Sequence, residues 1–94
     1  MAHRVVWSSR AVADVEAIAT YIALDSAAYA RAVVKRIVNA TRNLSRFPKV
    51  GREVPEFHDP KVREVFAYSY RIIYEVGDRE VVIAAVIHGK RDLG

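Results

Sequence analysis

The residues best suited to chemistry lie in the last third of the chain, and most of them are basic. Arg63 and Arg71 occur within two β-type runs, and Lys90 and Arg91 lie shortly after a third. Burying a cationic group without a partner is costly, so each must reach solvent or pair with an acid. If these groups converge on one open sheet surface, they could bind phosphate and stabilise the charge of a phosphoryl-transfer transition state.

Both arginines within strands also have a structural alternative. Arg71 could instead pair with Glu64 or Glu75, and Arg63 could pair with Asp59. A guanidinium group held in this way would hold the fold together rather than bind a ligand.

His88 is the histidine best placed for acid–base catalysis, because it ends a strongly apolar run. A surface or capping role is its alternative. His3, His58 and His88 lack the close spacing of a metal site, and the sequence has no cysteine and no nucleotide-binding glycine loop. We therefore expect neither a metal nor a cofactor.

Length and charge narrow the class of protein. Ninety-four residues predict a single domain spanning residues 1–94, and a formal net charge of +4 favours a polyanionic or acidic partner. No apolar run approaches the roughly 20 residues of a membrane span. The N-terminus lacks the features of a signal peptide, so we expect a cytoplasmic location without membrane association.

Hydrophobic periodicity and turn residues predict the elements that position these groups. Ser8 or Ser9 caps a first helix, and Asp25 or Ser26 caps a second that ends near Arg46. Residues 47–60 form a connecting loop. The predicted strands are Arg4–Trp7, Val62–Phe66, Tyr70–Val76 and Val81–Ile87. The last is apolar throughout, which is typical of an interior strand.

Apolar stripes on both helices predict a helical hairpin packed on one face of the sheet. The first helix has a main apolar stripe and a smaller one, which predicts that the helix is packed against other residues on two sides. The stripes consist of Ala11, Val15, Ile18 and Ile22, of Ala13, Ala17 and Leu24, and, in the second helix, of Ala30, Val34, Ile37, Thr41 and Leu44. The order is β-αα-βββ, an α+β fold with an antiparallel-rich sheet.

The second helix also carries a cationic face. Arg31, Lys35, Arg42 and Arg46 fall within about 60° of one another at about 100° per residue. This face and the groove beside it would suit an acidic segment of a partner protein, both by electrostatic steering and by apolar burial.

Motifs along nearly the whole chain match one protein family. They are Trp7-Ser8, Ala11, Asp14-Val15, Ile18 and Tyr21-Ile22 near the start; Leu44, Phe47-Pro48, Gly51-Arg52 and Pro55-Glu56 in the loop; and Val62-Arg63-Glu64, Ser69 to Tyr74 and Val86 to Leu93 in the strands. With these motifs the chain resembles the ParE/RelE superfamily of toxins from type II toxin–antitoxin modules. It most resembles the ParE-like branch, often called plasmid-stabilisation proteins.

The resemblance implies the β-αα-βββ fold and a toxin neutralised in complex with a cognate antitoxin, whose flexible C-terminal segment wraps the toxin. RelE-like members cleave ribosome-bound mRNA with basic residues of the sheet and a C-terminal tyrosine or histidine-tyrosine. On that reading the catalytic set would be Arg63, Arg71, His88 and Arg91. ParE-like members instead inhibit DNA gyrase by protein–protein contact and arrest growth.

This chain departs from the nuclease pattern, because Leu93-Gly94 directly follows the basic cluster and no terminal tyrosine is present. His88 also does not clearly match the histidine of the nuclease members. We therefore expect a non-enzymatic gyrase inhibitor that contacts its target through Arg63, Arg71, Lys90 and Arg91. The alternatives are a ribosome-dependent mRNA endoribonuclease and an inactive relative that only binds the antitoxin.

Overall fold

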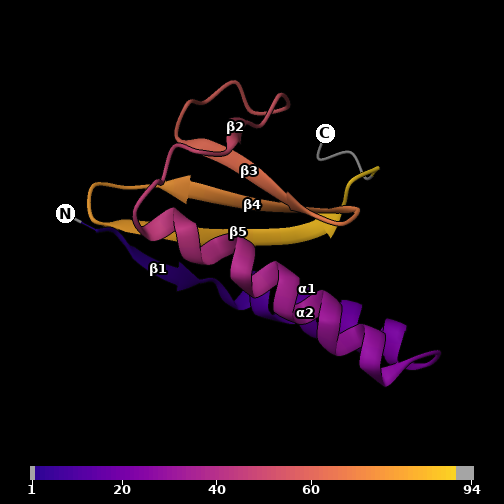
Figure 1. The fold of residues 1–94 in the computed structure, drawn as a ribbon. Coiled ribbons are helices and arrows are strands. Elements are labelled where there is room, and N and C mark those ends of the chain that lie inside the picture. Colours follow the sequence, from indigo (N-terminus) through magenta and orange to yellow (C-terminus); the bar gives the residue numbers. More distant parts are fainter. Residues whose placement is uncertain (1, 91–94) are drawn as a thin grey trace.

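A short strand, two helices and a run of strands follow one another along the chain, as predicted. The computed structural model describes residues 2–90. Its elements are β1 (Arg4–Trp7), α1 (Ser9–Ala23), α2 (Ala27–Arg42), the 3-10 turn η1 (Asn43–Ser45), β2 (Arg52–Glu53), β3 (Val62–Ala67), β4 (Tyr70–Val76) and β5 (Glu80–His88). Figure 1 shows the two helices side by side across one face of the twisted sheet.

Serine side chains begin both helices. The Ser8 hydroxyl oxygen accepts a hydrogen bond from the Ala11 N–H at 3.0 Å, and the Ser26 hydroxyl accepts one from the Tyr29 N–H at 3.0 Å. Each bond satisfies a donor that has no partner within the first turn of the helix. The caps are therefore Ser8 and Ser26, and α2 ends at Arg42 rather than near Arg46.

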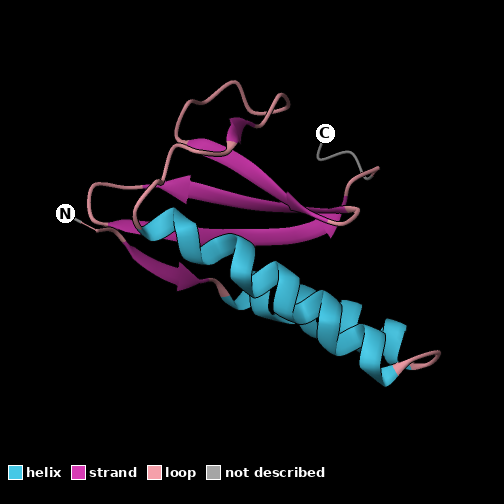
Figure 2. Cartoon of the chain, in the orientation of Figure 1, coloured by secondary structure: helices cyan, strands magenta, loops and turns pink. Residues whose placement is uncertain are grey.

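The sheet has the strand order β1-β5-β4-β3-β2 in the described part of the chain, with β1 parallel to β5 and every other pair antiparallel. This arrangement confirms the predicted α+β class (Figure 2). β5 lies between β1 and β4, which explains why its residues Val81 to Ile87 are all apolar. β2 corrects the prediction of a continuous loop over residues 47–60, because Arg52 and Glu53 pair with Glu64 and Arg63 of β3.

The main core lies between the helices and the sheet. It is built from Ala11, Val33, Ile37, Leu44, Ala67, Ile72, Tyr74, Val81, Ile83 and Val86. Val33, rather than the predicted Val34, is buried in α2, and Val34 is half-buried. A smaller core of Val54, Ile73, Ala85 and Ile87 covers part of the opposite face.

The prediction that a second face of α1 is buried is wrong. Ala13 and Ala17 are exposed, and the Leu24 side chain is 79% exposed. The end of the helical hairpin, where Leu24 follows α1, extends beyond the strands (Figure 1). Within residues 2–90 no helix is both long and apolar enough to span a bilayer.

Candidate functional site

Arg71 lies on the sheet face away from the helices and is held by two carboxylates. Its Nε donates to Glu64 Oε1 at 2.6 Å, while Nη1 and Nη2 donate to the two carboxylate oxygens of Glu56 at 2.9 Å each. The residue is only 6% exposed. The Glu56 hydrogen bonds raise the pKa of the Arg71 guanidinium, and they outweigh the opposing effect of burial. Arg71 therefore stays cationic, with its charge balanced locally.

Glu64 connects Arg71 to a second arginine. Its side chain is fully buried, and its Oε2 accepts from Arg52 Nε at 2.6 Å. Two guanidinium groups thus face two carboxylates in a network of Arg52, Glu64, Arg71 and Glu56. The structural alternative for Arg71 is confirmed for Glu64. Glu75, the other predicted partner of Arg71, does not belong to this network. The contact between Arg71 and Glu56 was not predicted.

Arg63 does not share a surface with Arg71, so the predicted convergence of these two arginines is wrong. In the β3–β4 register Arg63 lies opposite Tyr74, whereas Arg71 lies opposite Phe66, three residues further along β3. An odd separation places two strand residues on opposite faces. Arg63 donates to the carbonyl oxygens of Pro60, Gly51 and Lys49 at 3.0, 2.9 and 3.4 Å, and none of the ion pairs found within residues 2–90 includes it, with Asp59 or otherwise.

His88 is also separated from Arg71. It pairs with Tyr70 in the register, packs edge-on against the Tyr70 ring at 5.9 Å, and its Nδ1 accepts from the Lys90 N–H at 3.2 Å. It therefore lies on the helix-facing side of the sheet, at the end opposite Arg63. Lys90 is exposed, and Arg91 lies outside the described residues. The geometry does not bring Arg63, Arg71 and His88 together around one bond.

The predicted cationic face is exposed and borders a groove. Arg31, Lys35, Arg42 and Arg46 all reach solvent. A groove of about 520 Å³ runs between α1 and α2, and Arg31 and Lys35 line it together with Ala19, Thr20, Ala23, Ala27, Ala30 and Val34. The small alanine side chains leave space between the helices, and Arg31 and Lys35 lie beside that space. This shape suits an apolar segment that carries acidic side chains.

An aromatic cluster at the β3–β4 turn was missing from the predicted site. Tyr68 adopts a positive φ of 52°, which is unusual for a tyrosine. Its ring packs edge-on against Tyr29 at 6.2 Å, and the Arg36 guanidinium lies 5.0 Å from its centroid. The sequence contained one indication of this cluster, because Tyr29 and Arg36 are seven residues apart and therefore lie on one helix face. Within residues 2–90 no cluster of acidic and histidine side chains could hold a metal ion.

Comparison with known proteins identifies a toxin family. The family model described as the ParE toxin of the type II toxin–antitoxin system parDE matches residues 5–93. A search of curated proteins finds no significant match.

Solved structures share the fold. The chain is similar to a chain of the chromosomal ParDE system of Pseudomonas aeruginosa, with 24% identity, coverage of 92% of this chain and 95% of that one, and a TM-score of 0.75. It is also similar to a chain of the RelBE2 toxin–antitoxin complex of Mycobacterium tuberculosis, with 22% identity, coverage of 94% of this chain and 99% of that one, and a TM-score of 0.66. The YoeB dimer of Staphylococcus aureus is similar at 16% identity, covering 94% and 98%, with a TM-score of 0.66.

Proposed function

The chain belongs to the ParE toxin family of type II toxin–antitoxin systems, and from this premise we propose that it inhibits DNA gyrase by protein–protein contact. A cognate antitoxin would hold it inactive in a hetero-oligomeric complex. Both partners of this proposal act in the bacterial cytoplasm, where we place the protein. Expression without the antitoxin should then arrest growth, the behaviour expected of a plasmid-stabilisation toxin.

The state of Arg71 is the observation that supports a non-enzymatic toxin. Its guanidinium is occupied by Glu56 and Glu64, so it has little capacity left to stabilise a phosphate in a transition state. His88 and Arg63 lie on the other face of the sheet, so they supply neither a proton nor a positive charge beside it. Cleavage of RNA would require such groups to converge on one phosphodiester.

A supercoiling assay with purified gyrase tests the proposal. Folded, antitoxin-free protein should inhibit supercoiling, and adding the antitoxin should restore it. Normal supercoiling at a large excess of folded protein would count decisively against gyrase as the target. Cleavage of mRNA in a translating extract, with supercoiling unaffected, would instead support the endoribonuclease alternative, and unimpaired growth with soluble protein present would support the inactive relative.

We also propose that the antitoxin's C-terminal segment binds the groove between α1 and α2. Lys35 and Arg31 line the groove, and Arg42 at the end of α2 and Arg46 just after η1 add further exposed positive charges. Such exposed charges act mainly on the association rate. Lys35→Glu should lower the rate at low salt on the order of tenfold, with less effect at high salt.

The exposed Arg79 in the β4–β5 turn offers a matched control. Arg79→Glu changes the net charge by the same amount, away from the groove. An equal loss of association rate in Arg79→Glu and Lys35→Glu would refute the groove as the docking site, because only the overall charge would then matter.

A further inference from the structure

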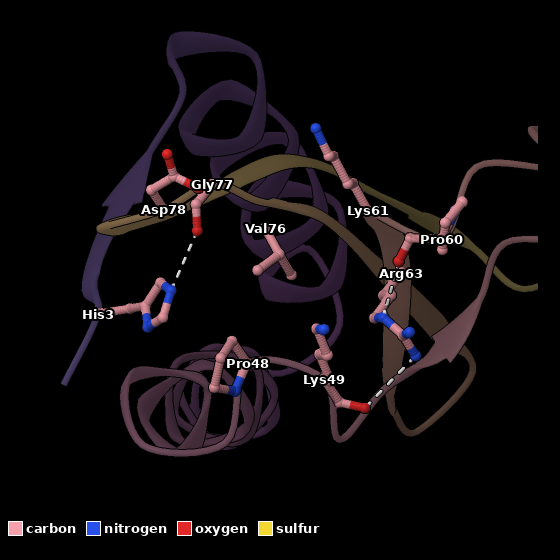
Figure 3. Close-up of a pocket in the computed structure, with 9 residues that line it drawn as sticks. All are labelled: His3, Pro48, Lys49, Pro60, Lys61, Arg63, Val76, Gly77 and Asp78. Carbon is pink, nitrogen blue, oxygen red and sulfur yellow. Dashed lines mark hydrogen bonds between the residues drawn. The ribbon is translucent and has the colours of Figure 1, made fainter. Parts of the chain in front are cut away.

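A cavity of about 500 Å³ opens where β4 turns into β5. Figure 3 shows its walls, which come from the start of the chain, the segment after η1, the loop before β3 and the β4–β5 turn. It shares no lining residue with the hairpin groove, and none with the Arg71 network. Its size falls within the roughly 300–1,000 Å³ of small-molecule sites.

The cavity carries an excess of positive charge. Lys49, Lys61 and Arg63 line it against one carboxylate, that of Asp78. The ion pairs found within residues 2–90 include none of these three cations. Three backbone carbonyl groups hold the Arg63 guanidinium in place, so it is fixed in orientation while its charge is not cancelled by an acid.

The interior of the cavity is apolar. Val76 lies between the two sides in Figure 3, with His3 bonded to the Gly77 carbonyl oxygen at 3.0 Å on one side and Arg63 on the other. Lys49 extends from the facing wall toward Val76. Pro48 and Pro60 add two further apolar surfaces. Lys61 points outward from the rim, and its flexible stem would let the ammonium group turn toward a bound anion.

We propose that this cavity binds a nucleotide, with the phosphate held by Lys49 and Arg63 and the base against Val76 and the prolines. A phosphate matches both the fixed guanidinium and the nearby ammonium. A flat base presents an apolar face to the cavity walls, a contact that tolerates any base. The nucleotide could be free or part of a single strand of nucleic acid. A carboxylate of an acidic peptide would use the cations and leave the apolar volume empty.

Titrations of the full-length, antitoxin-free protein followed by 15N NMR test this proposal. The probes are adenosine monophosphate, inorganic phosphate, a short single-stranded oligonucleotide and a glutamate-rich peptide. Amide shifts should concentrate at Lys49 and at residues 61–63 and 76–78. Adenosine monophosphate should bind more tightly than inorganic phosphate, and Lys49→Ala should weaken its binding about tenfold, equivalent to about 1.4 kcal/mol.

Two double variants that each lose two positive charges separate the role of the cavity residues from the effect of net charge. Lys49→Ala/Lys61→Ala should lose most of the binding, whereas Arg10→Ala/Arg79→Ala should retain it, because both of those arginines lie outside the cavity lining. Tighter binding of the oligonucleotide through the same amides would identify nucleic acid as the source of the nucleotide. Equal affinity for inorganic phosphate, preference for the acidic peptide, shifts spread over the surface, or equal losses in both double variants would each overturn the proposal.

Discussion

Replacing Arg71 by leucine should destabilise the protein by about 3–5 kcal/mol, because Glu64 would be left charged and incompletely paired inside the fold. The Glu64 side chain is 0% exposed, and Arg71 Nε supplies the 2.6 Å hydrogen bond to its Oε1. Among the residues that the structure describes, the contact from Arg52 to Oε2 is then the one ion pair left to Glu64.

The remaining contacts contribute much less to this figure. The Arg52 side chain is 59% exposed, so its attraction to Glu64 is screened by water. The Glu56 side chain is 21% exposed, so water can reach its carboxylate when Arg71 is replaced. A domain of this size is stable by about 5–15 kcal/mol, so Arg71→Leu would remove a large share of the free energy of unfolding.

Urea unfolding followed by far-UV circular dichroism measures the effect. The midpoint should fall while the slope m stays the same. The double variant Arg71→Leu/Glu64→Leu should regain most of the loss, because the buried charge is then gone. A loss of less than about 1 kcal/mol in Arg71→Leu, as expected of an exposed ion pair, would refute the reasoning. So would a double variant no more stable than the single one.

Three further predictions concern single substitutions that change the fold's stability. Tyr74→Phe should cost about 1–3 kcal/mol in urea unfolding, because the buried Gly51 N–H, 2.9 Å from the hydroxyl oxygen, loses its acceptor. Burial raises the folded-state pKa of Tyr74 above its unfolded value of about 10. Its contribution to stability is therefore complete below about pH 10 and is lost as the pH rises through the folded-state pKa, so the decline in alkali should be shallower in Tyr74→Phe. Gly51→Ala should cost about 1–3 kcal/mol in the same assay, since a Cβ would lie 2.5 Å from the Glu64 carbonyl oxygen. Ser26→Ala should cost about 1 kcal/mol, because the Tyr29 N–H loses its cap.

Matched substitutions control these three predictions. Tyr21 is 76% exposed, so Tyr21→Phe should be nearly neutral. A Cβ on Gly77 would approach nothing nearer than the Glu80 carbonyl oxygen at 3.3 Å, so Gly77→Ala should cost less than Gly51→Ala. Ser9→Ala alters an exposed serine inside α1 that is not the cap. A control as destabilising as its partner would show that the named contact is not responsible.

Regular patterns made most of the fold predictable from the sequence. β1 and β4 have the predicted bounds, because each is a run of β-type residues between clear breaks. β2 was not predictable, since Arg52 and Glu53 have no strand pattern of their own and are extended only because β3 pairs with them. Val33 is buried in place of the predicted Val34. The helical period does not distinguish these neighbours, because the orientation of α2 on the sheet decides which of the two is buried.

The candidate site was less predictable because it depends on register and on a loop. The β3–β4 turn consists of Tyr68 and Ser69, so Ala67 pairs with Tyr70, and Arg63 and Arg71 must then face opposite sides. A prediction that ended the strand at Phe66 left this pairing undetermined. Glu64 was a foreseeable partner of Arg71, whereas Glu56 reaches it from a loop 15 residues earlier, and no sequence period predicts such a contact.

The parallel pairing of β1 with β5 sets an order of events during synthesis. Arg4 lies beside Glu80, 76 residues later. A ribosome adding about 5–20 residues per second needs roughly 4–15 s to make the intervening chain. Until then β1 has no partner strand, and the sheet that carries the arginines and supports the hairpin is incomplete. The growing polypeptide therefore cannot present its finished surfaces until β5 has been made, and an antitoxin has that interval in which to be synthesised.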